Sequence, residues 1–485
     1  MPCTTILVGK KATFDESTII ARNDDGRFEV KGTKIIDRNQ NPKVYKSVLS
    51  KVSIPLPEYS YRYTSHPNLP NECKKRGVWP ASGINEFNVG MNATETISSN
   101  PLVEGADPLV ELKEVKGKTI PGGIGEEDLV TLVLPYIKSA REGVIRLGEL
   151  LEKYGTYERN GLAFNDENEI WWFESIGGHH FIAKRVKDDE MVIMPNQFGL
   201  DNFDFNDAYG EQKENICSKD LKDFMVKNHL DLNLGKSFNP RLAFGSHTDQ
   251  DHIYNTPRSW FLLKYFAPNT YKFTGCNADY TPISDNIPWS FKPEHKVTIQ
   301  EIKYVLSSYY QGTEFNPYGK DANKGKYRSI GVPNTDVCSL EQIRNNLPKE
   351  IQGLEWCSFG GGAFTCFFPQ YTYVSKVPNY LGKSTETVST NCMYWSSRII
   401  AALTDAHFAK AVVFTERYQL EVLNESYRLL NEYDAKFIKD NKESILEEAN
   451  EKIIEMVKRL TDRTLNDVLL VASNNMKTRF NREDN

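Results

Sequence analysis

The first 25 residues of this chain contain two strand-like runs joined by a short stretch of turn-forming residues. The first run, residues 6–8, follows Cys3, and the second, residues 18–21, leads directly into Arg22 and Asp25. The residues between the runs are rich in Gly, Lys, Asp and Ser, so we expect an antiparallel β-hairpin. In such a hairpin the end of the second strand lies beside the start of the first. The pattern therefore predicts that Arg22 and Asp25 lie close to Cys3.

This neighbourhood would give Cys3 nucleophilic chemistry. A guanidinium beside a thiol favours the thiolate, which is the nucleophile. If Met1 and Pro2 are removed, Cys3 also carries the free α-amino group, whose ordinary pKa of about 7.7–8.0 lets it act as a general base near neutral pH. Nucleophile and base would then belong to one residue. The alternative is that Cys3 is a small apolar residue that opens a buried strand.

Length and composition exclude several classes of protein. A chain of 485 residues is long enough for a large core and for about two to four domains. A net charge of -6 argues against a nucleic-acid surface built on bulk positive charge. The N-terminus lacks the pattern of a signal peptide, and no run approaches the roughly 20 apolar residues of a membrane-spanning helix. We therefore expect no nucleic-acid partner and no membrane partner.

The eight cysteines are widely spaced and contain no Cys-x-x-Cys pair. Such sparse cysteines are typical of free thiols in a reducing compartment rather than of a disulfide framework. This pattern predicts a cytoplasmic protein.

Several further segments have strand or helix patterns. Helices are expected after residue 126, as a pair split near Gly143, and over 299–309. Two long antiparallel helices are expected over 420–437 and 445–460, separated by residues 440–442, and they could cover the core or pair subunits. The segments with strand patterns are 59–63, 83–96, 161–174, 181–186, 191–194, 337–338, 354–359 and 364–367.

Three motifs invite alternative interpretations. The glycine-rich residues 122–125 are not followed by Gly-Lys-Ser/Thr, so a phosphate loop is not expected. His179 and His180 are adjacent in an expected strand and would point to opposite faces, one buried and one partly exposed. Residues 247–252 contain two His and two Asp, which fits either a metal site or a polar active-site loop, and we favour the loop.

Six stretches of the first 260 residues together resemble the cysteine dipeptidases of the N-terminal nucleophile (Ntn) hydrolase superfamily. More distantly, they resemble bile salt hydrolases and penicillin V acylases. The stretches occur in the family's order, and together they are specific where each alone would be weak. They are Cys3-Thr4-Thr5, Ala21-Arg22-Asn23-Asp24-Asp25, residues 83–96 with Gly83-Ile84-Asn85-Glu86 and Asn92-Ala93-Thr94-Glu95-Thr96, residues 172–180, Pro195-Asn196-Gln197, and Tyr254-Asn255-Thr256-Pro257-Arg258.

The resemblance implies an α+β fold, namely a four-layer αββα sandwich of two antiparallel sheets with helices outside. The catalytic domain would span residues 3–393, and a helical extension packed on the core would span residues 394–485. The family needs neither a cofactor nor a metal. The expected activity is hydrolysis of dipeptides by Cys3 after removal of Met1 and Pro2, in a cytoplasmic homo-oligomer that binds short peptides.

The resemblance also implies roles for the other site residues. Arg22 would lower the pKa of the Cys3 thiol, and Asp25 would orient the Cys3 amine. Asn92 and Asn196 would donate to the oxyanion, and Arg258 would complete the charged wall.

Two alternatives to a dipeptidase stay open at this point. A bile-acid amide or penicillin acylase would share every catalytic residue. The second alternative is a non-enzymatic protein, because secernin-like relatives share the scaffold and have been linked to secretion. In addition, relatives often carry an acidic residue and a histidine where this chain has Ser307, Ser308, Tyr309 and Tyr310. That departure predicts an altered rim of the substrate pocket.

Overall fold

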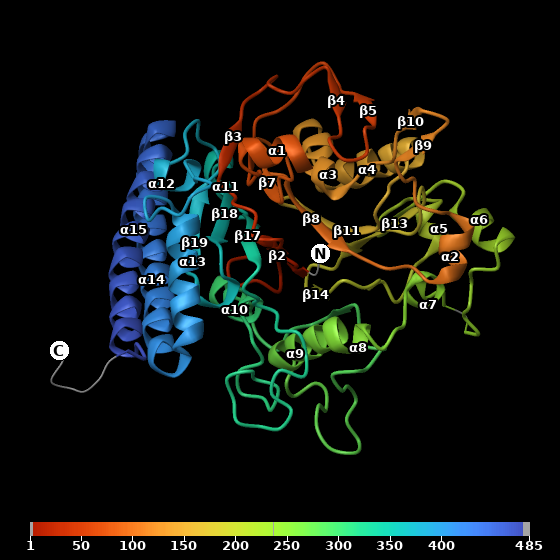
Figure 1. Ribbon diagram of the computed structural model, residues 1–485. Coiled ribbons are helices and arrows are strands. Elements are labelled where there is room, and N and C mark those ends of the chain that lie inside the picture. Colours follow the sequence, from red (N-terminus) through yellow and green to blue (C-terminus); the bar gives the residue numbers. More distant parts are fainter. Residues whose placement is uncertain (1–2, 236, 479–485) are drawn as a thin grey trace.

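The computed structural model describes residues 3–235 and 237–478, and it is built around two large antiparallel sheets (Figure 1). Met1 and Pro2, whose removal the sequence predicts, lie outside the described residues. The seven-stranded sheet has the order β16 (Ser290–Phe291), β14 (Met191–Met194), β1 (Thr4–Val8), β2 (Thr18–Asp25), β17 (Thr335–Ile343), β18 (Gly353–Phe359) and β19 (Phe368–Tyr371). The six-stranded sheet has the order β15 (Asn215–Cys217), β13 (Phe181–Val186), β12 (Ile170–Ser175), β11 (Asn160–Asn165), β8 (Gly90–Thr96) and β7 (Ser82–Ile84).

The predicted N-terminal hairpin lies in the middle of the seven-stranded sheet. β1 pairs with β2 on one side and β14 on the other, and Thr5 stands opposite Arg22 in the ladder. Every residue of β1 and β2 is buried, as expected for central strands. Leu7 and Ile20 belong to the apolar cluster shared by the two sheets, so Thr5 and Arg22, two residues away along their strands, face the second sheet as well.

The two sheets face each other through β2 and β17 on one side and β8 and β11 on the other. Apolar residues fill part of this interface, including Leu7, Ala163 and Trp172. Polar contacts cross it near the start of β1, where the Thr5 hydroxyl donates to Glu95 Oε1 at 2.6 Å. The polar region is thus enclosed by backbone from both sheets.

Helices α3 (Glu126–Val133) and α4 (Ala140–Tyr154) pack on the six-stranded sheet. The predicted split near Gly143 is wrong, because the chain breaks at a 3₁₀ turn containing Pro135 and restarts at Ser139, whose hydroxyl accepts from the Glu142 amide. Gly143 lies inside α4, and a Cβ there would stand 2.5 Å from the Phe164 ring. The glycine therefore reflects close packing of the helix on the sheet.

At the C-terminal end, α13 (Met393–Ala406), α14 (Phe408–Asp440) and α15 (Glu443–Asn474) lie side by side (Figure 1). The two long helices and their break are confirmed, with Asn441 in the left-handed region at φ 48°. Helix α13 was not predicted as a separate element. Most buried apolar residues of α14 and α15 belong to the same apolar cluster as β18 and β19, so these helices cover the seven-stranded sheet.

The remaining elements are short. The helix expected over 299–309 ends at Leu306, the strand expected over 59–63 begins only at Tyr63, and the strand expected over 364–367 begins at Phe368. The other strands are β3 (Lys34–Ile36), β4 (Val44–Lys46), β5 (Ser53–Pro55), β6 (Tyr63–Ser65), β9 (Lys113–Val115) and β10 (Lys118–Ile120). The other helices are α1 (Pro70–Arg76), α2 (Pro101–Ala106), α5 (Phe205–Ala208), α6 (Leu221–Lys227), α7 (Pro240–Phe244), α8 (Asp251–Tyr254), α9 (Thr256–Phe266), α10 (Ile299–Leu306), α11 (Lys349–Gln352) and α12 (Asn379–Gly382), with 3₁₀ turns η1 (Leu134–Tyr136) and η2 (Gly362–Phe364).

His179 and His180 do not alternate along a strand as predicted. Both lie in the turn before β13, and both ring Nδ1 atoms reach the carboxylate of Asp107, at 3.1 and 2.8 Å. In the described part of the chain, no helix is both long enough and apolar enough to cross a membrane.

Candidate active site

Cys3 lies directly before β1, and its sulfur is in contact with Arg22, as the hairpin predicted. The distance from Arg22 Nη2 to Cys3 Sγ is 3.1 Å. Both side chains are almost completely buried, with 1 % of Cys3 and 2 % of Arg22 exposed. The thiol is therefore enclosed, but its neighbour is a cation and not an apolar wall.

The Arg22 guanidinium is shared among several acceptors. Its Nη2 atom lies 3.0 Å from both Asp24 Oδ1 and Glu126 Oε1, and Nη1 donates to the carbonyl of Ala93 in β8. These contacts join the end of β2, the start of α3 and the second sheet. They fix the guanidinium against the sulfur, and they also divide its charge among three anionic or polar partners.

The thiol pKa differs from the expectation. Burial raises the pKa of the Cys3 thiol well above its ordinary range, and the charge of Arg22 offsets this only in part. The carboxyl groups of Glu95, Asp24 and Asp25 raise the pKa of the thiol further. Burial therefore favours the protonated thiol of Cys3 over the thiolate.

Arg258, near the start of α9, approaches Cys3 from the other side. It is fully buried, and its Nη1 atom donates to the backbone carbonyl of Cys3 and, at 2.7 Å, to Thr4 Oγ1. Its Nη2 atom donates to Asn196 Oδ1 at 2.8 Å and to Asn255 Oδ1 at 2.7 Å. Arg258 is thus an anchored group that connects the nucleophile's backbone to Asn196, and it is not a surface arginine.

Asn196 follows β14 after Pro195, as expected for a polar side chain presented at the end of a strand. Its Nδ2 atom donates to the carbonyl of Thr96, the last residue of β8, at 3.0 Å. Its side chain therefore joins the seven-stranded sheet to the six-stranded sheet beside Arg258.

Asp25 is fully buried at the end of β2. Thr335 donates to its Oδ1 atom at 2.6 Å, and Arg328 forms an ion pair with its Oδ2 atom. Burial raises the pKa of Asp25, and the charge of Arg328 opposes that rise. Asp25 also acts electrostatically on the Cys3 thiol, which agrees with its predicted position near the nucleophile.

Asn92 has other partners. Its Nδ2 atom donates to Glu341 Oε2 at 2.8 Å and lies 3.4 Å from Ser339 Oγ, both in β17. The next residue in β8, Ala93, accepts from Arg22, so Asn92 stands next to the site in sequence. The described contacts direct its amide along the interface between the sheets.

The polar segment before α9 is built from local hydrogen bonds. Asp251 accepts from Thr248 and Asn255, and His252 Nε2 lies 2.9 Å from Asp285 Oδ1. Across residues 3–235 and 237–478, no group of three or more His, Cys, Asp or Glu side chains is arranged to hold a metal ion. This segment supports Asn255 and Arg258, in agreement with the polar-loop interpretation.

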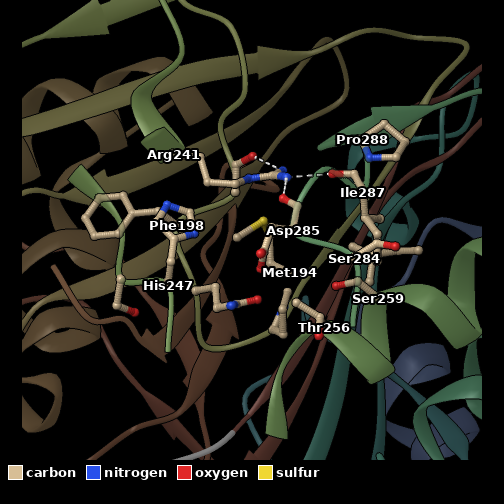
Figure 2. Close-up of a pocket in the computed structure, with 15 residues that line it drawn as sticks. Met194, Phe198, Arg241, His247, Thr256, Ser259, Ser284, Asp285, Ile287 and Pro288 are labelled. Atoms are coloured by element: carbon tan, nitrogen blue, oxygen red, sulfur yellow. Dashed lines mark hydrogen bonds between the residues drawn. The ribbon is translucent and has the colours of Figure 1, made fainter. Parts of the chain in front are cut away.

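A small pocket lies beside Asn196 and Arg258 and is lined by their sequence neighbours Gln197, Thr256 and Ser259 (Figure 2). Arg241 spans it and donates to the carbonyls of Gly199 and Ile287, at 2.6 and 2.7 Å. Its interior of about 30 Å³ has room for one or two water molecules. This pocket is too small to accept a dipeptide.

Sequence reasoning brought together Cys3, Arg22 and Arg258 correctly but missed three supporting groups. Arg328 lies in no recognised motif, and its partner Asp25 is 303 positions away in the chain. Glu126 was predicted only as an acidic residue at the start of a helix, and Glu95 only as part of a motif that resembles the family. A single sequence does not indicate that an arginine will be buried and will donate to several acceptors.

The sequence comparisons agree with this arrangement. The profile of peptidase family C69 matches residues 2–421. The "Dipeptidase" of Bifidobacterium longum (strain NCC 2705) is 43% identical over 535 residues, covering 100% of both chains. The "Probable dipeptidase A" of Streptococcus pyogenes serotype M3 (strain SSI-1) is 44% identical over 491 residues, again covering 100% of both. The "Dipeptidase A" of Lactobacillus helveticus is 38% identical over 476 residues, covering 96% of this chain and 94% of that one. The resemblance seen in the sequence is confirmed: this chain belongs to peptidase family C69.

Proposed function

We propose that this protein hydrolyses dipeptides and that its nucleophile is Cys3, made N-terminal by removal of Met1 and Pro2. The observation that carries the proposal is the contact of Arg22 Nη2 with Cys3 Sγ at 3.1 Å, in a site where Arg258 binds the Cys3 carbonyl. The names of the relatives, all dipeptidases, support the substrate class. The other acyl-amide hydrolases of the superfamily are the alternative.

The α-amine of trimmed Cys3 would take the thiol proton, directly or through a water, and the thiolate would attack the peptide carbonyl carbon. The protonated amine would then give that proton to the leaving nitrogen as the C–N bond breaks. Water would hydrolyse the resulting thioester, release the first amino acid and restore the thiol. Asp25, held by Thr335 and Arg328, would orient the amine through this cycle.

Negative charge develops on the carbonyl oxygen when the thiolate attacks. The amides of Asn196 and Asn92 are the proposed donors, and removing one such donor typically costs about 10²–10³ in rate. Arg258 would hold Asn196 in place by donating to the Oδ1 atom of Asn196. Asn92 would have to turn part of its hydrogen bonding from Glu341 toward the substrate.

The reactivity of the thiol would depend on access to the sulfur. Burial raises the pKa of the Cys3 thiol. Access of solvent or substrate to the sulfur would reduce this desolvation, and the contribution of Arg22 would then favour the thiolate.

We further propose that the two sheets and their helices form the four-layer αββα sandwich of Ntn hydrolases over residues 3–393. Residues 394–485 would be a helical extension of that domain. We also propose a cytoplasmic location, because all eight cysteines are free thiols. The homo-oligomer is proposed from the family resemblance. Light scattering after size-exclusion chromatography would measure the subunit number.

The deciding experiment is a dipeptide-library hydrolysis screen of the wild type and of Cys3→Ala, with intact-mass analysis of both. We expect the active wild type to lack Met1 and Pro2, and Cys3→Ala to be inactive. Penicillin V and a bile-acid amide serve as the comparison substrates. Faster turnover of those amides than of any dipeptide would contradict the proposed substrate, and full activity with Met1 and Pro2 retained would contradict the amine as base.

A further inference from the structure

A dipeptide places strict demands on the surroundings of the nucleophile. Its α-ammonium nitrogen is attached to the carbon next to the scissile carbonyl, so the group that binds this ammonium must stand close to the attacking sulfur. A carboxylate is the natural partner of an ammonium. Three carboxyl groups, those of Glu95, Asp24 and Asp25, lie close enough to the Cys3 thiol to raise its pKa.

Two of these three carboxylates are already paired with cations. Asp24 contacts Arg22 at 3.0 Å and Lys31 at 3.7 Å. Asp25 is paired with Arg328 and accepts from Thr335. The negative charge of each is thus already balanced by a cation and is not fully available to bind a substrate.

Glu95 differs from both. Its Oε1 atom accepts from the neutral hydroxyl of Thr5 at 2.6 Å, while its Oε2 atom is buried with no hydrogen-bond partner in the described parts of the chain. None of the ion pairs found among those residues includes Glu95. A buried carboxyl oxygen without a partner is costly and calls for an explanation, such as a ligand that supplies the missing donor.

The position of Glu95 also fits a substrate contact. It is near the end of β8, where a register shift opposite Gly161 and Leu162 places one extra residue between Ala93 and Glu95. Such bulges often re-aim a side chain next to an active site. Ala93 accepts from Arg22, and Thr5, which donates to Glu95, stands opposite Arg22 in the ladder. Glu95 is thus bonded to a direct neighbour of the arginine that contacts the sulfur.

The electrostatics agree with this geometry. Burial raises the pKa of Glu95 to about 8, and the charges of Arg22 and Arg258 do not fully offset it. Burial therefore favours the protonated form of this carboxyl group. The ammonium of a substrate would favour the carboxylate, with release of the proton to solvent.

We infer that Glu95 Oε2 binds the α-ammonium group of the substrate and thereby makes the site select peptides with a free amino terminus. This inference rests on the proposed dipeptidase activity. Glu126 is the main alternative, because its Oε2 atom also has no partner among the residues that the structure describes, but its charge is engaged by Arg22 at 3.0 Å.

The experiment compares two substrates that differ only in the ammonium. One is an alanyl dipeptide, and the other is the propionyl amide of the same leaving amino acid, in which hydrogen replaces the ammonium. The variants are Glu95→Gln, which keeps the shape and the bond from Thr5, and Glu126→Gln as a matched control. For Glu95→Gln we expect kcat/KM to fall about 10- to 100-fold on the dipeptide, mainly through KM, and to change little on the propionyl amide.

In the control, Glu126→Gln, kcat/KM should fall to the same degree on both substrates, because the loss of Glu126 acts through Arg22. An unchanged ratio between the two substrates in Glu95→Gln would overturn the inference while leaving the dipeptidase proposal intact. A wild type that cleaves the propionyl amide but not the dipeptide would overturn both. If Glu95→Gln does not fold, Thr5→Val provides the test, because it removes the hydroxyl that donates to Glu95 Oε1. We then expect a smaller drop in the ratio of kcat/KM on the dipeptide to kcat/KM on the propionyl amide.

Discussion

Arg22 Nη2 lies 3.1 Å from Cys3 Sγ and 3.0 Å from Glu126 Oε1, so one guanidinium serves both the thiol and a buried carboxylate. The thiol gains only part of the arginine's charge. Burial has the largest effect on the pKa of the Cys3 thiol, and the charge of Arg22 offsets it only in part. This sharing predicts that the reactivity of Cys3 depends on how the guanidinium is held as much as on its presence.

Arg22→Lys tests that dependence. The ammonium keeps the charge but cannot contact the sulfur, Asp24 and Glu126 together, because it lacks the planar fork of arginine. We expect alkylation of Cys3 by iodoacetamide to slow, and kcat/KM on dipeptides to fall about 10²-fold. Arg344→Lys is the control, because Arg344 is a partly buried arginine paired with Asp434 far from Cys3 along the chain. Equal losses in the two variants would contradict the assigned role of Arg22.

Asn196→Ala and Asn92→Ala separate catalysis from stability. Both are expected to lower kcat by about 10²–10³ if each amide donates to the oxyanion. Asn92→Ala should also lower the free energy of unfolding, by about 1–3 kcal/mol, because it removes the donor to the buried Oε2 atom of Glu341. Steady-state kinetics and urea unfolding measure the two effects. A loss of stability with unchanged kcat in Asn92→Ala would remove Asn92 from the oxyanion site.

Glu174 predicts a dependence of stability on pH. Burial raises the pKa of this carboxyl group from its ordinary 4.5 to about 7 in the folded protein. Between these pH values the unfolded chain has released a proton that the folded chain retains. The contribution of Glu174 to stability is therefore fully present below pH 4.5 and is lost as the pH rises through 7.

Glu174→Gln should therefore weaken this slope and be more stable relative to wild type at pH 8 than at pH 5. The glutamine keeps Oε1, which accepts from Trp172 Nε1 at 2.9 Å. Urea unfolding at the two pH values gives the comparison. A variant that loses the same stability at both pH values would show that Glu174 acts only through its hydrogen bonds.

Leu460→Ala tests whether the C-terminal helices share the core of the seven-stranded sheet. Leu460 in α15 is 2 % exposed and belongs to the same apolar cluster as Trp356 in β18. We expect the free energy of unfolding to fall by about 2–5 kcal/mol in a single transition. Leu469→Ala, at a position that is 51 % exposed in the same helix, should change it by less than about 0.5 kcal/mol. A separate early transition in Leu460→Ala would instead indicate that the helices unfold independently.

The sequence by itself determined the local elements and the central contact. Alternating β-rich runs with a polar turn between them fixed the first hairpin, and its antiparallel register placed Arg22 at Cys3. Recurrent apolar steps of three and four fixed the two long C-terminal helices. Each of these features depends on residues close together in the chain, so a local pattern was enough.

The tertiary structure decided which distant groups share the site. Arg258 reaches the Cys3 carbonyl, Arg328 pairs with Asp25, and Asn92 turns to Glu341, over separations of 255, 303 and 249 residues. It also decided that the thiol is desolvated and that one oxygen of Glu95 has no partner within residues 3–235 and 237–478. Burial and long-range pairing arise only when the two sheets close on each other. No pattern within a single strand encodes them.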